Sequence, residues 1–201
     1  MNLISLLVSF GFLIIAMSVH EFAHGWVAYK LGDATAKHSG RLTLNPLAHI
    51  DPIGTVALPI FLYIATGGQF VFGAAKPVPI NFAALKNPKQ DIVWIGASGP
   101  AANLIFASVL SGITKLIALP PTLSFIFTNL IFINVILGVF NLIPIPPLDG
   151  SRVLMGLLPD RLAARYAQME PYGFLIVMLL FAMGILDLIL IPLVRIVLRL
   201  L

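Results

Sequence analysis

The sequence has no cysteine and very little charge. Without cysteine the chain can form no disulfide bond and no thiolate metal site. Only 10% of its 201 residues are charged, whereas 59% are hydrophobic and the mean hydropathy is +1.02. A soluble domain of this length would need a far larger charged fraction to cover its surface. The composition therefore excludes an ordinary soluble protein and indicates an integral membrane protein.

The sequence also lacks the patterns of a nucleic-acid-binding protein and of a secretory signal. The basic residues, which exceed the acidic ones by a formal charge of +4, are not interleaved with aromatic residues as in RNA- or DNA-binding proteins. We therefore expect the lipid bilayer, and no nucleic acid, as a partner. The N-terminal segment also lacks a basic stretch and a small-residue cleavage site, so we do not interpret it as a secretory signal.

Four apolar stretches are long enough to cross the hydrocarbon of a membrane, which takes roughly 20 residues. They lie at 3–19, 91–114, 123–143 and 172–194. The first helix is expected to continue to Leu31 and to stop at Gly32-Asp33, because no proline interrupts it. No internal repeat or soluble accessory domain is visible, so we expect residues 1–201 to form a single membrane-embedded domain.

The segment between the first two of these stretches differs from a full span. Alternation over residues 40–44 predicts a short β-strand that ends at Asn45-Pro46. Residues 53–66 are apolar, but as a helix they would reach only about two thirds of the hydrocarbon thickness. We therefore predict an all-α polytopic membrane protein with four to five transmembrane helices. A short re-entrant or β segment is expected between the first two major helices.

Three scarce ionisable residues lie together at the end of the first apolar run, in VHEFAHGWV (19–27). The chain has four histidines and two glutamates, and His20, Glu21 and His24 are among them. Histidines four positions apart share a helix face, so both imidazoles can bind one metal ion, and zinc suits them. In H-E-x-x-H motifs the glutamate takes a proton from a metal-bound water. Because ionisable residues are costly in a membrane, we interpret the motif as a metal site rather than a chance pair of histidines.

A catalytic zinc needs a third protein ligand and an open fourth position. The best candidate is Asp149 in NLIPIPPLDG (141–150), where three prolines break helical bonding at membrane depth. Irregular backbone is tolerated at that depth only where protein buries it or where it lines a wet cavity. The alternative is that Asp149 caps a helix over 151–158. His49 and Asp51 are weaker candidates, for which turn capping or surface exposure is favoured.

The two motifs together resemble the site-2 protease family of intramembrane zinc metalloproteases. The resemblance spans about residues 3–158 and includes Ser98 to Asn103 (SGPAAN), which is similar to the family's G-P-x-x-N element. It implies one Zn²⁺ per chain, a transmembrane protein as the substrate, and the ligand set His20, His24 and Asp149 with Glu21 as the general base.

The resemblance also bears on two asparagines and on the size of the protein. It implies that Asn141 shapes the site or holds the substrate strand, with an interhelical hydrogen bond as the equal alternative. Asn103 is a second site-shaping candidate, for which a contact between helices is favoured. Many family members carry PDZ or CBS domains, for which this chain has no room, so we expect a compact form without them.

The ligand set constrains the topology. If residues 53–66 crossed the membrane fully, Asp149 would emerge on the side opposite His20; if they dip in and return, the ligands meet. The re-entrant arrangement places nine basic residues on one side and three on the other, whereas a full span gives six and six. The three are Lys115, Arg195 and Arg199. The positive-inside rule then places the metal toward the cytoplasm.

The leading hypothesis is peptide-bond hydrolysis in a membrane cavity, in which an unwound substrate helix pairs with residues 40–44 or 71–80. The first alternative is a membrane metal-ion transporter or metal sensor. It would use the same three ligands without Glu21, but its ionisable groups should form a path across the membrane, and here they cluster at one depth. Asp187 in the last span has no evident partner. An inactive substrate-binding relative is a third possibility, although the ligands and the base are all present.

Overall fold

The structure is a computed structural model that describes residues 3–67, 73 and 75–201, with side chains from residue 8 onward. Its described residues form helices and irregular segments, without a β-strand among them. The main helices are α1 (Leu3–Lys30), α2 (Thr35–His38), α3 (Leu58–Ala65), α4 (Pro88–Leu116), α5 (Pro121–Asn141), α6 (Asp149–Leu157), α7 (Asp160–Ala167), α8 (Gly173–Ala182) and α9 (Ile185–Leu200). Short 3₁₀ or π turns lie at Pro46–His49, Pro52–Ala57, Phe82–Ala84 and Glu170–Tyr172. The predicted all-α class is confirmed.

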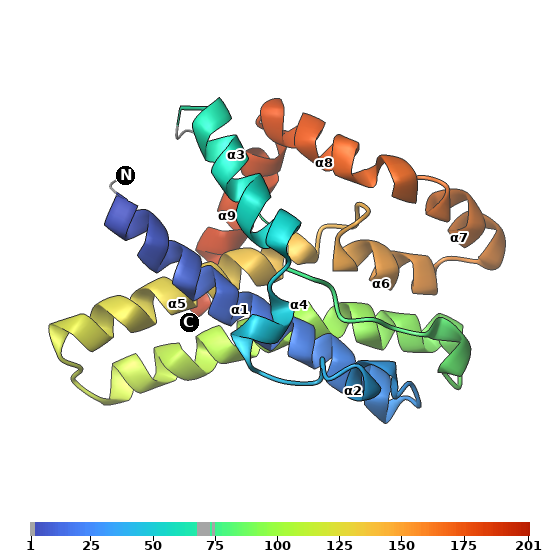
Figure 1. The fold of residues 1–201 in the computed structure, drawn as a ribbon, viewed down its shortest axis with the longest axis horizontal. Coiled ribbons are helices and arrows are strands. Elements are labelled where there is room, and N and C mark those ends of the chain that lie inside the picture. Colours follow the sequence, from blue (N-terminus) through green and yellow to red (C-terminus); the bar gives the residue numbers. More distant parts are fainter. Residues whose placement is uncertain (1–2, 68–72, 74) are drawn as a thin grey trace.

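Helices α1, α4 and α5 form the central bundle, in which α1 packs against both of the others. Figure 1 shows that α1 and α5 point the same way, whereas α4 runs in the opposite direction. Both α4 and α5 begin with a proline, which suits the first helical position because its missing N–H would have no partner there. The parallel course of α1 and α5 is what brings the end of α5 to the middle of α1.

The end of α1 is held by a buried aspartate. Gly32 follows the helix with φ of 115°, and Asp33 is fully buried. The Asp33 carboxylate accepts hydrogen bonds from the N–H groups of Thr35 at 2.9 Å and Asn81 at 2.6 Å. Burial alone would raise the pKa of Asp33, but these hydrogen bonds bring it below its ordinary value. The carboxylate therefore ties the segment that returns to α4 to the end of α1.

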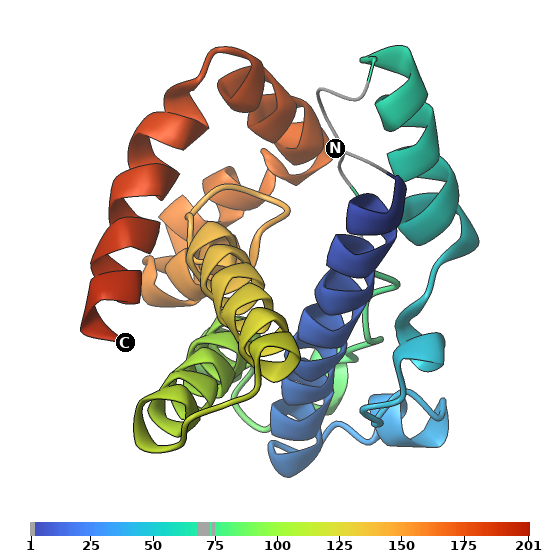
Figure 2. The same ribbon diagram turned by 90° about the vertical axis from the view of Figure 1, so that its left-hand side faces the viewer.

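The chain between α1 and α4 thus leaves and returns at the same end of the bundle, as Figure 2 also shows. The strand predicted at 40–44 is wrong. The Arg41 N–H bonds the Ala36 carbonyl at 2.8 Å, and the Asn45 N–H bonds the Thr43 hydroxyl at 3.1 Å. These turns occupy groups that a sheet would need, and the described residues place no partner strand beside them.

The described residues contain three to four candidate spans, so they reach the lower end of the predicted four to five only if a bent helix pair counts as one span. Three described helices are long and apolar enough to cross a membrane: Val8–Lys30 within α1, then α4 and α5. A fourth span is reached if Asp160–Ala182 and Ile185–Leu200, which meet at 81°, count as one. The apolar helix Pro52–Ala65 is shorter than these. Its entry into the membrane, and the single-domain organisation, remain predictions.

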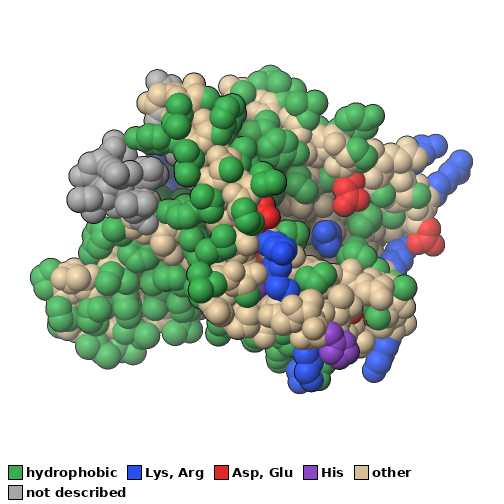
Figure 3. Space-filling view, viewed as in Figure 1, with side chains coloured by type: hydrophobic (Ala, Val, Ile, Leu, Met, Phe, Trp, Pro, Cys, Tyr) green, Lys and Arg blue, Asp and Glu red, His purple; other side chains and the backbone are tan. Residues whose placement is uncertain are grey.

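The exposed surface supports a membrane location. Large apolar side chains on α4 and α5 are exposed, among them Ile105, Val109, Leu116 and Phe125. Figure 3 shows one face on which apolar side chains cover the half with the end of α4 and the beginning of α5, while lysine and arginine lie at the centre and in the other half, toward α2, α6 and α7. Such an apolar surface would be a liability in water but suits contact with lipid.

Candidate metal centre

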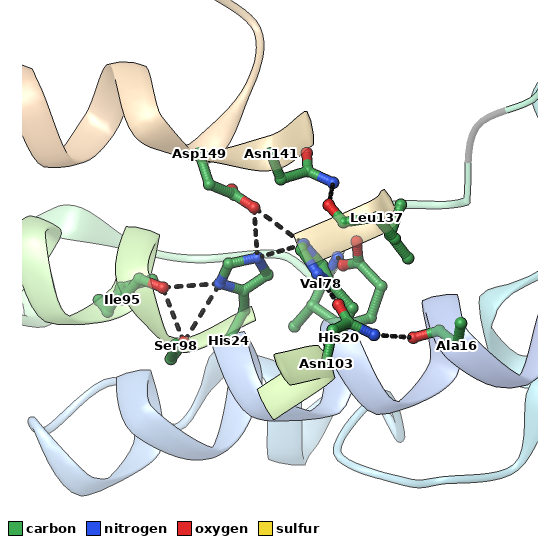
Figure 4. Close-up of polar contacts among 11 residues, drawn as sticks. Ala16, His20, His24, Val78, Ile95, Ser98, Asn103, Leu137, Asn141 and Asp149 are labelled. Atoms are coloured by element: carbon green, nitrogen blue, oxygen red, sulfur yellow. Dashed lines mark hydrogen bonds and ion pairs between the residues drawn. The ribbon is translucent and has the colours of Figure 1, made fainter. Parts of the chain in front are cut away.

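His20 and His24 lie one turn apart on α1 and converge on Asp149, the first residue of α6 (Figure 4). The two Nε2 atoms are 3.0 Å apart. They lie 2.8 Å (His20) and 3.1 Å (His24) from Oδ2 of Asp149. Both histidines are buried, with about 6% and 7% of their surface exposed. Three potential ligand atoms thus face one point, and the spacing of the histidines on α1 explains two of them.

The remaining ring nitrogens are bonded in a way that suits metal binding. Nδ1 of His24 lies 2.7 Å from the Ile95 carbonyl, which can only accept, so Nδ1 carries the hydrogen and donates. Nδ1 of His20 lies 2.6 Å from Oδ1 of Asn103. When Nδ1 carries the hydrogen, Nε2 offers its lone pair, and such bonds orient histidine ligands in metal sites.

Gly99 on α4 forms the floor of the site. A Cβ at this position would lie 2.6 Å from Nε2 of His20 and closer still to Nε2 of His24. Only the absence of a side chain lets α4 approach the two imidazoles. Two neutral imidazoles with one carboxylate are the ligand set of a catalytic zinc. The donor types, their convergence and this close backbone all fit a zinc ion held by His20, His24 and Asp149.

The change Gly99→Ala tests this packing, and Gly112→Ala on the same helix is its control. The methyl group at Gly99 must displace a histidine ring, whereas a Cβ at Gly112 meets nothing within 4 Å. We expect Gly99→Ala to weaken zinc binding at least about tenfold, as for other changes that disturb ligand orientation. Chelator competition measures the affinity. Equal zinc affinity for the two variants would contradict the assigned geometry.

The turn before Asp149 explains why the carboxylate faces α1. Helix α6 begins at Asp149 itself, so the capping position belongs to Leu148 and the capping alternative is not what the structure shows. Gly150 packs against the chain that precedes it, where a Cβ would overlap the Leu142 carbonyl. A negative side chain in the first turn of α6 also suits the helix dipole.

Glu21 lies beside His20 and borders the same cavity. One of its carboxylate oxygens accepts a hydrogen bond from the Val78 N–H at 2.8 Å. The cavity of about 160 Å³ is lined by the three candidate ligand residues, Glu21, Asn141 and Arg152, among others. It has room for water, whose share of liquid volume is about 30 Å³.

A larger, mostly apolar cavity of about 600 Å³ adjoins His20, Glu21 and Asn141 and continues between α1, α5, α8 and α9. Asn141 lines both cavities, and its Nδ2 donates to the Leu137 carbonyl of its own helix at 2.9 Å. The interhelical bond considered for Asn141 is therefore absent among the described residues. Asn103 does make interhelical contacts, to α1 and α5.

The weaker ligand candidates lie outside the cluster. His49 is buried and its Nε2 donates to the Thr43 carbonyl at 2.8 Å, while Asp51 accepts from the Gly54 N–H at 2.6 Å. Arg152 borders the small cavity but is not among the site residues predicted from the sequence. Its position one turn after Asp149 on α6 could have indicated that it lies near the site. The Val78 N–H and the Ile95 carbonyl are backbone groups that leave no mark in the sequence.

Fold and site together define an all-helical membrane protein of the metallopeptidase class. The chain is similar to "Putative zinc metalloprotease YwhC" of Bacillus subtilis (strain 168), with 39% identity over 178 residues that cover 84% of this chain and 77% of that protein. The chain belongs to Peptidase family M50, whose profile matches residues 118–185. The earlier resemblance is thereby confirmed. The matched segment contains Asn141 and Asp149, whereas the histidines and Glu21 precede it.

Two further relatives cover less of the chain. "Putative zinc metalloprotease Rip2" of Mycolicibacterium smegmatis (strain ATCC 700084 / mc(2)155) is 35% identical over 102 residues, which are 51% of this chain and 38% of that protein. Rip2 of Mycobacterium tuberculosis (strain H37Rv) is 33% identical over 107 residues, which are 53% of this chain and 39% of that protein. No solved structure matches the chain.

Proposed function

We propose that this metallopeptidase hydrolyses peptide bonds within or near transmembrane segments of membrane proteins, with one Zn²⁺ per chain. The observation that carries the proposal is that the three ligand residues and Glu21 border one small cavity, which adjoins a larger apolar one. The small cavity has room for water, and the large one suits the side chains of a membrane segment.

In the proposed reaction, Glu21 transfers the proton and the Val78 N–H positions Glu21. When bound, zinc supplies a Lewis acid for the scissile carbonyl and lowers the pKa of a bound water to about 7. Glu21 takes the proton from the attacking water and delivers it to the leaving amine. The Val78 N–H engages one oxygen of Glu21 and holds the side chain beside the cavity.

The segment near Val78 is a poor partner for strand pairing by the substrate. The N–H groups of Lys76 and Val78 already bind the His49 carbonyl and Glu21, and Pro77 and Pro79 have none. A substrate strand along 76–79 would therefore find only carbonyl acceptors. We propose that the walls of the large cavity hold the substrate instead.

We also propose that the metal lies toward the cytoplasm, because most basic residues fall at the end of the bundle where the chain between α1 and α4 begins and ends. The absence of cysteine permits single-cysteine labelling at Lys37, Lys86 and Lys115, all of which are exposed. An impermeant maleimide added to intact cells is expected to label only the cysteine at position 115. Labelling at 86 but not at 37 would instead show that 53–66 crosses the membrane fully. Labelling at both 37 and 86 would reverse the orientation.

A further inference from the structure

We propose that Asn134 is a positioning residue for the metal ligand His20, and that it acts through Asn103. The inference rests on the proposed metal centre and adds a residue to it that does not border the cavity of the metal ligands. Asn134 lies on α5, is fully buried, and contacts neither the carboxylate nor the imidazoles by any hydrogen bond described for it.

The direction of the Asn134 amide is fixed by a backbone carbonyl. Its Nδ2 lies 2.8 Å from the Leu130 carbonyl, which can only accept, so Nδ2 must be the donor at that end. Its Oδ1 therefore faces Asn103 and accepts a hydrogen bond from Nδ2 of that residue at 2.7 Å. The Asn134 side chain thus presents an acceptor, and never a donor, to Asn103.

Both amide hydrogens of Asn103 are used in hydrogen bonds to other residues. Its Nδ2 has two hydrogens, one for Oδ1 of Asn134 and one for the Ala16 carbonyl at 2.9 Å. Its Oδ1 then points at Nδ1 of His20, 2.6 Å away, and can only accept. Nδ1 of His20 must carry the hydrogen, which leaves the lone pair of Nε2 for the metal.

A flipped Asn103 amide would give the opposite tautomer. Its oxygen would then face two acceptors, the Ala16 carbonyl and Oδ1 of Asn134, and its Nδ2 would donate to Nδ1 of His20. The hydrogen of the neutral imidazole would move to Nε2, which could not bind zinc without losing it. Asn134 supplies one of the two acceptors that oppose this flip.

His24 offers an internal reference, because its Nδ1 bonds the Ile95 carbonyl directly and does not depend on any side-chain amide of α5. Loss of Asn134 should therefore disturb the tautomer of His20 and leave that of His24 unchanged. A general loss of packing would disturb both rings. This difference separates a positioning role from a merely structural one.

The test compares Asn134→Leu with Asn129→Leu in the full chain. Asn129 lies on the same helix and makes the same bond, from Nδ2 to the carbonyl four residues earlier at 2.8 Å, but it is half-buried, whereas Asn134 is fully buried. Zinc affinity is measured by chelator competition, and ¹⁵N NMR of labelled histidine in the metal-free protein reports the tautomers. We expect Asn134→Leu to bind zinc about tenfold more weakly, as when other residues that orient metal-ligating histidines are changed. In the NMR spectrum of this variant, only His20 should show the hydrogen on Nε2. Asn129→Leu should match the unaltered protein.

A rescue variant tests whether the acceptor at position 134 is what matters. In Asn134→Asp, a protonated carboxyl can donate to the Leu130 carbonyl and accept from Asn103, so zinc affinity and the His20 tautomer should be restored. If Asn134→Leu does not fold, Asn134→Ser replaces it under the same criteria, because its hydroxyl can bond the Leu130 carbonyl but is too short to reach Asn103.

Two results would overturn the inference: zinc affinity of the folded variant within twofold of Asn129→Leu, or an unchanged His20 tautomer. Failure of the proposed function is distinguishable, since in that case the unaltered protein would bind no zinc or would cleave nothing.

Discussion

Glu21→Gln should abolish cleavage while zinc stays bound. The amide cannot accept the proton of the attacking water, and loss of a general base costs about 100- to 10,000-fold in rate. Its carbonyl oxygen can still accept the Val78 N–H, so the side chain should keep its place. Zinc content by mass spectrometry and cleavage of a reporter transmembrane protein are the two measurements.

The matched control is Glu170→Gln, since Glu170 is the other glutamate of the chain and lies in the turn before α8. It should retain both zinc and cleavage. Unchanged cleavage in Glu21→Gln would remove the proposed peptidase mechanism. If the unaltered protein bound zinc but cleaved nothing, a metal transporter or sensor would become the better interpretation.

Asp149→Ala should lose both zinc and cleavage. The Oδ2 atom of Asp149 is the point on which both Nε2 atoms converge, so its removal leaves two ligands where a catalytic zinc needs three. Changes in residues that only orient a ligand cost about 10- to 100-fold in metal affinity, and loss of a ligand should cost more than about 100-fold. Treatment of the unaltered protein with a chelator should reproduce the loss, and added zinc should reverse it there but not in the variant.

Asp187→Ala provides the control for charge, because Asp187 is an exposed aspartate in the apolar helix α9 and lies outside the ligand cluster. It should bind zinc as tightly as the unaltered protein. Full zinc occupancy in Asp149→Ala would show that this carboxylate is not a ligand. The metal would then have to be held by other residues.

The strand predicted at 40–44 shows where local pattern fails. Alternation of apolar and polar residues is a local signal, but a strand also needs a neighbour that supplies its hydrogen bonds. Arg41 and Asn45 instead find partners within a few residues, in the turns that follow α2. The Arg41 guanidinium also bonds the Lys76 carbonyl at 2.6 Å, a contact across 35 positions of sequence. No local pattern indicates such a contact.

The sequence by itself determined the class of the protein and the local part of its candidate metal site. Composition alone requires a membrane, since so few charges cannot cover a soluble surface. The placement of His20 and His24 on one face follows from the helical period, which is a local property. The prolines and the glycine around Asp149 likewise indicated a break in the helix, where irregular backbone lines a cavity or is buried and a carboxylate can be placed.

Only the tertiary structure decided what surrounds those residues. The parallel course of α1 and α5 brings Asp149 to His20 across 129 positions, and α4 supplies Gly99, Asn103 and the Ile95 carbonyl. Two of these contacts depend on a backbone atom or on an absent side chain. The physical reason is that hydrogen bonds and close packing between distant helices depend on how the helices cross, and the period of a single helix carries no information about that.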